Sequence, residues 1–98
     1  MSSENEILLQ RLLSSDIKTE LLALFHENPG LVDTTSGVAL RIGMTGTEVE
    51  GDVRDFVELG LLTKRTLGEG KTEVVQLNRS RDREIQASLA KYFRGLKK

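Results

Sequence analysis

The chain has 98 residues, with 14 Lys and Arg against 15 Asp and Glu, so its formal net charge is −1. A domain of this length can bury a modest core, and the lack of cysteine excludes disulfides, thiol chemistry and cysteine-ligated metals. Because no apolar run approaches the roughly 20 residues that span a membrane and no signal peptide is recognisable, we expect one cytoplasmic domain without membrane contact.

The small net charge conceals a division along the chain. Residues 1–62 hold eleven acidic and four basic side chains, whereas residues 63–98 hold ten basic and four acidic ones. The basic part could lie along phosphate groups, or it could face the acidic part of a second copy. Both interpretations stay open at this point.

Two helices are expected at the start of the chain. Residues 4–13 form a short one whose apolar side chains include Ile7, Leu8, Leu12 and Leu13, and a helix this short needs a partner surface. Ser15 or Asp16 can cap a second helix over 17–27, which has an apolar face of Ile17, Leu21, Leu24 and Phe25. An Asn-Pro-Gly sequence ends this helix, because the residue before proline avoids helical geometry. Residues 31–32 can form a minimal strand.

The middle of the chain has the pattern of two helices joined by a tight turn. Asp33 or Thr34 caps the first helix, and Gly43 ends it. Thr45 caps the second helix, which ends at Gly60, where a positive φ is easily adopted. The apolar stripe of this second helix consists of Val49, Val53, Phe56 and Val57. Helix, glycine-containing turn and helix make a helix-turn-helix.

A hairpin and a last helix complete the predicted elements. Residues 61–66 and 72–78 are expected to be strands, joined by a turn with two glycines over 67–71. A helix then starts at Ser80, and its apolar stripe is Ile85, Leu89, Tyr92, Phe93 and Leu96. This stripe could cover the core of its own chain or pair with a second copy. Aromatic residues are enriched at interfaces, so we favour a homodimer formed through this helix.

The central segment resembles the winged helix-turn-helix regulators of the ArsR/MarR type. The residues that carry the resemblance are Ala39, Leu40, Arg41, Ile42, Gly43, Met44, Thr45, Val49, Val53, Phe56, Gly60, Leu61 and Leu62. It implies an α+β, mostly helical fold with a three-helix core and a β-hairpin wing, plus additional N- and C-terminal helices. On this basis residues 1–14 are a helical extension, 15–78 the winged helix-turn-helix domain, and 79–98 a C-terminal helix that serves as a possible dimerisation element.

The resemblance also implies a DNA-binding transcriptional regulator that needs no cofactor and is not an enzyme. The helix after Thr45 would lie in the major groove of double-stranded DNA and the basic wing on its backbone. Arg54 could contact phosphate or guanine, and Glu50 could accept a hydrogen bond from cytosine. The predicted DNA contacts are Thr45, Thr47, Glu50, Gly51, Arg54, Lys64, Arg65 and Lys71.

Gly51 stands inside the second helix of the pair. A glycine there costs about 1 kcal/mol relative to alanine. Either the site is a tolerant surface position, or a DNA backbone or a partner helix approaches closely there. The residue type alone does not choose between the two.

The predicted recognition helix is acidic, with Glu48, Glu50, Asp52, Asp55 and Glu58 against Arg54. Phosphate neutralisation supplies most non-specific affinity for DNA, so bases elsewhere must compensate. The candidates are Lys64, Arg65, Lys71, Arg79, Arg81 and Arg83. The alternative is a winged-helix protein–protein interaction module whose acidic helix binds a basic protein partner.

Catalytic and metal sites are not expected. His26 is the single histidine, and its place at a helix end suggests a capping or surface residue. The Gly-Glu-Gly sequence of the hairpin lacks the Lys-Ser/Thr of a phosphate-binding loop. The acids of the predicted recognition helix do not follow a calcium-loop spacing, so we expect them to form a solvated face.

Overall fold

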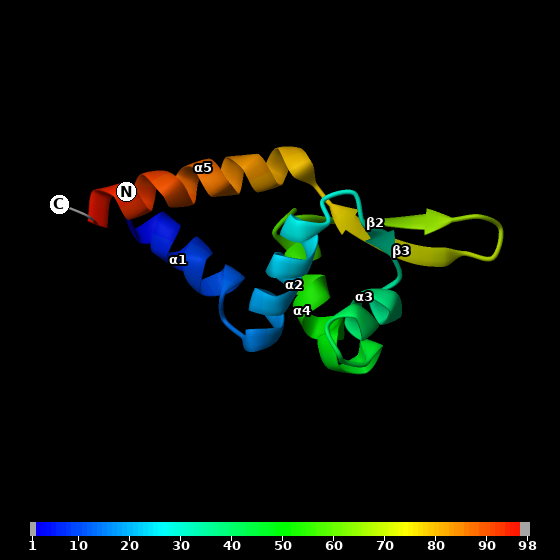
Figure 1. The fold of residues 1–98 in the computed structure, drawn as a ribbon. Helices are drawn as coiled ribbons and strands as arrows, with labels where there is room; N and C mark the ends of the chain where they lie inside the picture. The colour runs from blue at the N-terminus through cyan, green and yellow to red at the C-terminus, as the bar shows by residue number, and fades with distance from the viewer. Residues whose placement is uncertain (1, 97–98) are drawn as a thin grey trace.

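The computed structural model describes the backbone of residues 2–96 and the side chains of residues 7–88, 90, 91 and 94. The elements within it are α1 (Ser2–Leu12), α2 (Asp16–Glu27), β1 (Val32–Asp33), α3 (Thr35–Arg41), α4 (Gly46–Glu58), β2 (Leu62–Leu67), β3 (Thr72–Leu77) and α5 (Arg79–Leu96). The fold is α+β, and the expected helix-turn-helix and hairpin are confirmed. Principal extents of 52 × 24 × 21 Å make the molecule elongated. Figure 1 shows the β2–β3 hairpin at one end and α1 with α5 at the other.

Local signals in the sequence set the starts and ends of the central helices. The hydroxyl of Thr34 accepts a hydrogen bond from the Gly37 amide and caps α3, and the hydroxyl of Thr45 accepts one from the Glu48 amide and caps α4. After α4, Gly60 adopts a φ of 80°, which a residue with a Cβ rarely adopts. Gly43, in the turn between α3 and α4, likewise has a φ of 75°. Short-range hydrogen bonds and these two glycines therefore set the ends of the helices in the helix-turn-helix.

The three strands form an antiparallel sheet in the order β1-β3-β2. Strand β1 lies one residue later than the predicted 31–32, with Val32 paired to Gln76. Helix α5 starts at Arg79 rather than Ser80, because the side chain of Asn78 accepts a hydrogen bond from the Arg81 amide and so caps the helix. These corrections shift boundaries by a single residue and leave the order of elements unchanged.

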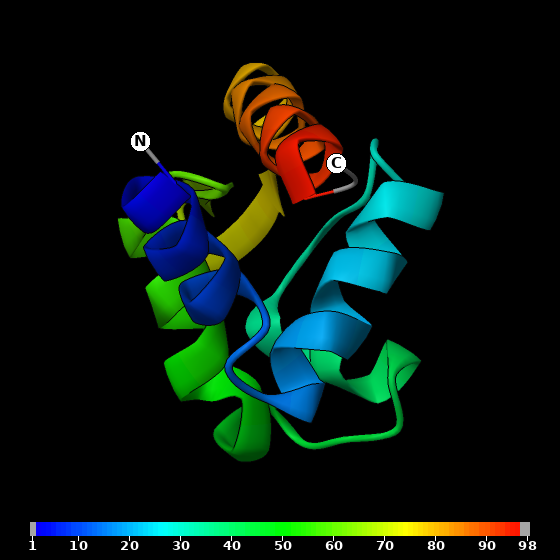
Figure 2. The same ribbon diagram turned by 90° about the vertical axis from the view of Figure 1, so that its left-hand side faces the viewer.

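The hydrophobic core lies between the helices and the sheet. It is built on α2, α3, α4 and the hairpin, and its members include Leu21, Phe25, Val38, Ala39, Val49, Val53, Phe56, Leu61, Leu62, Val75 and Leu77. Leu12 of α1 and Ile85 of α5 also belong to it, so the first and last helices cover part of the core. In Figure 2, α5 lies above α2 and α4, and the turn between α3 and α4 lies below them.

Candidate nucleic-acid interface

Helices α3 and α4 are held in close contact where the second begins. A Cβ placed on Gly46 would lie 2.7 Å from Oγ of Ser36 and 3.4 Å from its Cα. Only a residue without a side chain allows this approach without a shift of Ser36. The first turn of α4 therefore packs directly against the first turn of α3.

The outward ridge of α4 consists of the side chains opposite its buried stripe. Val49, Val53 and Phe56 are 0%, 3% and 1% exposed and face the core. At about 100° per residue, the other side carries Thr47, Glu50, Gly51, Arg54 and Glu58, all of which are exposed. A Cβ on Gly51 would meet no described atom within 4 Å, so the fold itself does not require glycine there.

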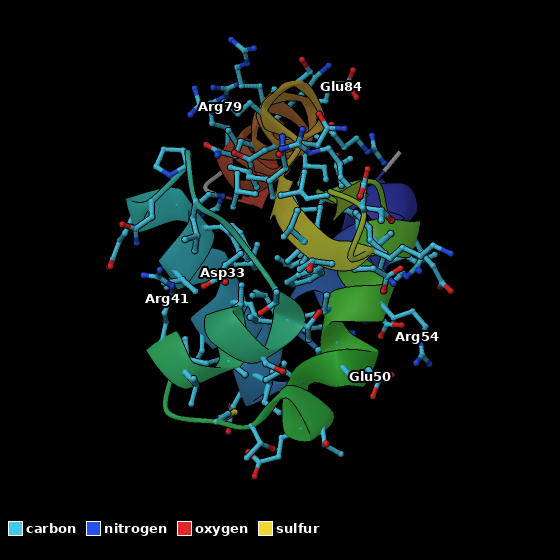
Figure 3. The ribbon with its side chains drawn as sticks, turned by 90° about the vertical axis from the view of Figure 1, so that its right-hand side faces the viewer. Asp33, Arg41, Glu50, Arg54, Arg79 and Glu84 are labelled. Carbon is cyan, nitrogen blue, oxygen red and sulfur yellow. The ribbon has the colours of Figure 1, made fainter. Side chains whose placement is uncertain are left out.

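A cleft of about 400 Å³ lies between the start of α3, the first half of α4 and the hairpin. It brings together four of the predicted contacts, namely Thr47, Glu50, Arg54 and Lys64. Glu50 and Arg54 extend from the outer side of α4, as Figure 3 shows. The cleft also includes residues that the sequence did not indicate: Thr35, Ser36 and Glu73. The adjacent hydroxyl residues after the α3 cap were the one signal that could have indicated Thr35 and Ser36.

The hairpin separates two bases that were predicted to act together. Side chains alternate between the faces of a strand, and Lys64 pairs with Val75 while Arg65 pairs with Val74. Lys64 lines the cleft on the face that carries Val75, so Arg65 lies on the other face. Lys71 is in the turn that joins β2 to β3. Its φ of 57° is the single positive value among the described non-glycine residues.

Both bases that line the cleft have carboxylate neighbours. The Nη2 atom of Arg54 donates a hydrogen bond to Oε1 of Glu50 at 3.4 Å, one helical turn before it. The Nζ atom of Lys64 is 3.8 Å from Oε1 of Glu73 on β3. All four side chains are exposed to solvent, so the two pairs are accessible to a ligand.

The acids on the flank of α4 do not form the fully solvated face that the sequence suggested. The Nζ atom of Lys18 lies 2.8 Å from Oδ2 of Asp55 and 3.9 Å from Oδ1 of Asp52. Ser15 Oγ donates a hydrogen bond to the same Asp52 oxygen. Lys18 is only 6% exposed, and the hydrogen bond that it donates holds the pKa of Asp55 below its ordinary value. Because Lys18, Leu21 and Phe25 share one side of α2, the helical spacing could have placed this lysine against a neighbour.

Two of the bases that follow the hairpin, Arg79 and Arg81, bind backbone carbonyls away from the cleft. Arg81 lies over Gly60, and its Nε donates a hydrogen bond to the Leu59 carbonyl at the end of α4. Arg79 Nε donates a hydrogen bond to the Pro29 carbonyl. In Figure 3, Arg79 lies in the upper part of the view, on the opposite side of the molecule from Glu50 and Arg54. These two arginines therefore support the fold near α5 and do not offset the acids around the cleft.

His26 has a partner that the sequence did not reveal. Its Nε2 is 2.9 Å from Oδ1 of Asp82, a carboxylate that is 7% exposed, and Gln86 donates a hydrogen bond of 2.7 Å to the other oxygen. This cluster connects the end of α2 to the start of α5. Within the described residues, no three His, Cys, Asp or Glu side chains come together as a metal site.

The predicted dimer stripe can be followed only in part. Ile85 is 3% exposed and packs in the core of its own chain. The side chains of Leu89, Tyr92, Phe93 and Leu96 lie outside the described residues. On α1, which contacts α5, Ile7 is 58% exposed. No helix in the described chain combines the length and the apolar character needed to cross a membrane.

The sequence matches no protein-family model and no curated protein. Its fold is similar to a possible transcriptional regulator from Methanosarcina mazei Go1, with a TM-score of 0.64 at 14% identity over 96% of this chain and 82% of the other. A possible transcriptional regulator for arsenical resistance gives 0.61 at 18% identity, over 89% and 83%. A protein from the thermoacidophilic archaeon Sulfolobus tokodaii gives 0.64 at 14% identity, over 98% and 94%. At these identities the chain shares a fold with these proteins over nearly its whole length.

Proposed function

We propose that this protein is a cytoplasmic, non-enzymatic transcriptional regulator of the winged helix-turn-helix type that binds double-stranded DNA. The observation that carries the proposal is the cleft that the outward ridge of α4 shares with Lys64 of the hairpin. A winged helix that binds a duplex needs its recognition helix and its wing on one side, and this arrangement meets that requirement. Two structures of similar fold come from possible transcriptional regulators.

The exposed ridge of α4 is suited to the major groove. A helix is about 10–12 Å across with its side chains, and the groove is about 12 Å wide. Arg54 can donate two hydrogen bonds to a guanine, and Glu50 can accept one from the amino group of a cytosine. Thr47 can contact a thymine methyl or a phosphate. In this assignment the first half of α4 reads base edges.

Neutral groups around the cleft can position the duplex without adding positive charge. Thr35, Ser36 and Thr47 bring hydroxyl groups to its wall from the first turns of α3 and α4. Hydroxyl side chains are frequent donors to phosphate oxygens, and such bonds set the register of a protein on DNA. Thr45 is exposed beside them, and Lys64 and Lys71 can neutralise phosphates from the hairpin. An acidic recognition helix can bind a duplex in this way.

We also propose that the protein forms a homodimer. Figure 1 places α1 and α5 at the end opposite the hairpin, so that end is available to a second copy. Ile7 of α1 is an exposed apolar side chain, at 58%, and so is Leu13, which directly follows α1, at 49%. Two copies joined through α1 and α5 would present two α4 helices to half-sites about 34 Å apart.

The second candidate function is a protein-interaction module, and the exposure of Glu48 and Glu58 on α4 favours it. A basic protein partner would meet these two acids. Asp52 and Asp55 are unsuitable for testing this function, because their charges hold the nearly buried Lys18. The partner would be captured by the wild type and lost when Glu48 and Glu58 are both changed to Lys.

The experiment that tests DNA binding is fluorescence anisotropy with a random-sequence duplex at about 50 and about 200 mM salt. Six phosphate contacts would lower the affinity roughly 10³-fold over this range, and the few bases available here predict a smaller but clear decrease. Absence of binding at the lower salt concentration, both by the wild type and by variants in which the carboxylates beside Arg54 and Lys64 are neutralised, would contradict the proposal and favour the protein partner.

A further inference from the structure

Two carboxylates stand beside the two bases of the cleft, and they come from different elements. Glu50 precedes Arg54 by one turn of α4, at 3.4 Å. Glu73 lies on β3, diagonally across the hairpin from Lys64 on β2, at 3.8 Å. Each base that could contact phosphate in this cleft therefore already has an anion as its neighbour.

These two ion pairs contribute little to the stability of the folded protein. The side chains of Arg54 and Glu50 are 63% and 64% exposed, and those of Lys64 and Glu73 are 47% and 62% exposed. Exposed ion pairs contribute little to folding. A pair one turn apart supports its helix slightly, and a diagonal pair across two strands supports its hairpin by a similarly small amount.

Carboxylate and phosphate oxygens accept hydrogen bonds from the same arginine and lysine donors. A phosphate that approaches Arg54 or Lys64 must displace the carboxylate or be repelled by it. We infer that Glu50 and Glu73 act as phosphate mimics that hold Arg54 and Lys64 in the free protein and restrain its binding to DNA of arbitrary sequence. This inference rests on the proposed DNA-binding function.

The restraint would make binding depend on sequence. A phosphate occurs at every step of any duplex, so the cost of displacing the two carboxylates applies to all sequences alike. A correctly placed cytosine amino group offers Glu50 a new hydrogen-bond donor, and a guanine offers Arg54 a new acceptor. A DNA site with these two bases offsets the cost of displacing the carboxylates, whereas a site of arbitrary sequence does not. The protein would then distinguish its specific site from other DNA partly because the two carboxylates disfavour binding to DNA of arbitrary sequence.

The test uses Glu50→Gln, Glu73→Gln and the double variant, because this change removes the charge and keeps the shape of the side chain. Glu84→Gln is the matched control: Glu84 pairs with Arg81 at 3.3 Å, and Figure 3 shows Glu84 on the opposite side of the molecule from Glu50. Anisotropy with a random-sequence duplex is measured from about 50 to about 200 mM salt. Thermal melting confirms that all variants fold.

The two single variants are expected to bind the random duplex several-fold more tightly than the wild type. Their salt slopes should steepen by about one for each base that gains a phosphate. Glu84→Gln should change the affinity less than twofold. The gain from Glu73→Gln should disappear when Lys64 is replaced by Met, because a carboxylate that acts through one lysine has no effect without it.

The outcomes separate this inference from the function on which it rests. If the wild type binds with a salt dependence and the Gln variants match Glu84→Gln, the inference is wrong and DNA binding stands. A gain from Glu73→Gln that persists without Lys64 also overturns it, since net charge alone then explains the effect. Failure of the wild type and of every variant to bind at about 50 mM salt overturns both proposals. Binding by the Gln variants alone would support the inference.

Discussion

The Nζ atom of Lys18 on α2 donates a hydrogen bond of 2.8 Å to Oδ2 of Asp55 on α4. Lys18 also donates to Oγ of Ser14 at 2.9 Å, so its nearly buried ammonium group has partners from two segments. Asp55 lies on the flank of α4 between the buried stripe and the outward ridge. Together with the buried stripe of α4, the contact therefore supports the rotation of this helix that presents its outward ridge to the cleft.

Acidification should weaken this contact. The Lys18 hydrogen bond holds the pKa of Asp55 below its ordinary value, which is about 3.9. A lowered pKa in the folded state means that the stabilisation is fully present above the ordinary value and is lost as the pH falls through the folded value. We expect the free energy of unfolding to decrease below about pH 4.

Urea denaturation of the wild type and Asp55→Asn checks this expectation. The variant should be less stable at neutral pH, because Lys18 loses the nearer of its two charged partners, and its stability should decrease less on acidification. Glu20→Gln, at an exposed position of α2, is the control and should follow the wild type. Parallel pH profiles for Asp55→Asn and the wild type would refute the assignment.

A methyl group at Gly46 should loosen the contact between α3 and α4. The added Cβ would lie 2.7 Å from Oγ of Ser36, and overpacking of this kind typically costs about 1–3 kcal/mol. Rotation of the short serine side chain should keep the cost of Gly46→Ala near the lower limit.

The combination with Ser36→Ala removes the oxygen and leaves contacts of 3.4 and 3.5 Å, which are ordinary packing distances. The double variant should therefore recover most of the lost stability in urea denaturation, with a non-additive effect that marks direct contact. Additive effects would show that the two residues do not meet.

Gly51→Ala should have opposite effects on stability and on DNA binding. An alanine in a helix is favoured over glycine by about 1 kcal/mol, and its Cβ would meet no described atom within 4 Å. Thermal melting should show a stabilised protein. If the duplex approaches α4 at this point, the same methyl group should reduce the affinity about tenfold, or 1.4 kcal/mol. A stabilised variant with unchanged affinity would show that the glycine is merely tolerated.

Lys64→Ala and Arg65→Ala form a pair of variants with the same change in charge at adjacent positions. Lys64 lines the cleft, whereas Arg65 lies on the other face of the hairpin. We expect Lys64→Ala to weaken duplex binding and reduce its salt slope by about one, with a much smaller effect of Arg65→Ala. Equal effects would contradict an interface centred on the cleft and favour one that covers both faces of the wing.

The predictions from sequence were most accurate where a structural feature depends on a few neighbouring residues. Thr34 and Thr45 cap their helices as single side chains that bond to an amide three residues later. Gly60 adopts the positive φ that ends α4. The order of helices and strands could be predicted because these short-range signals do not require knowledge of how the elements pack.

The partners of the charged residues could not be predicted in this way. Lys18 meets Asp55 across 37 positions of the chain, and His26 meets Asp82 across 56. Similarly, only the strand register places Lys64 beside Glu73 in the cleft. Helical and strand periodicity indicates which side of an element a residue occupies, but packing angle and register decide what faces that side. The local sequence therefore determined the elements of the fold, and tertiary packing decided which charges remain accessible at the candidate interface.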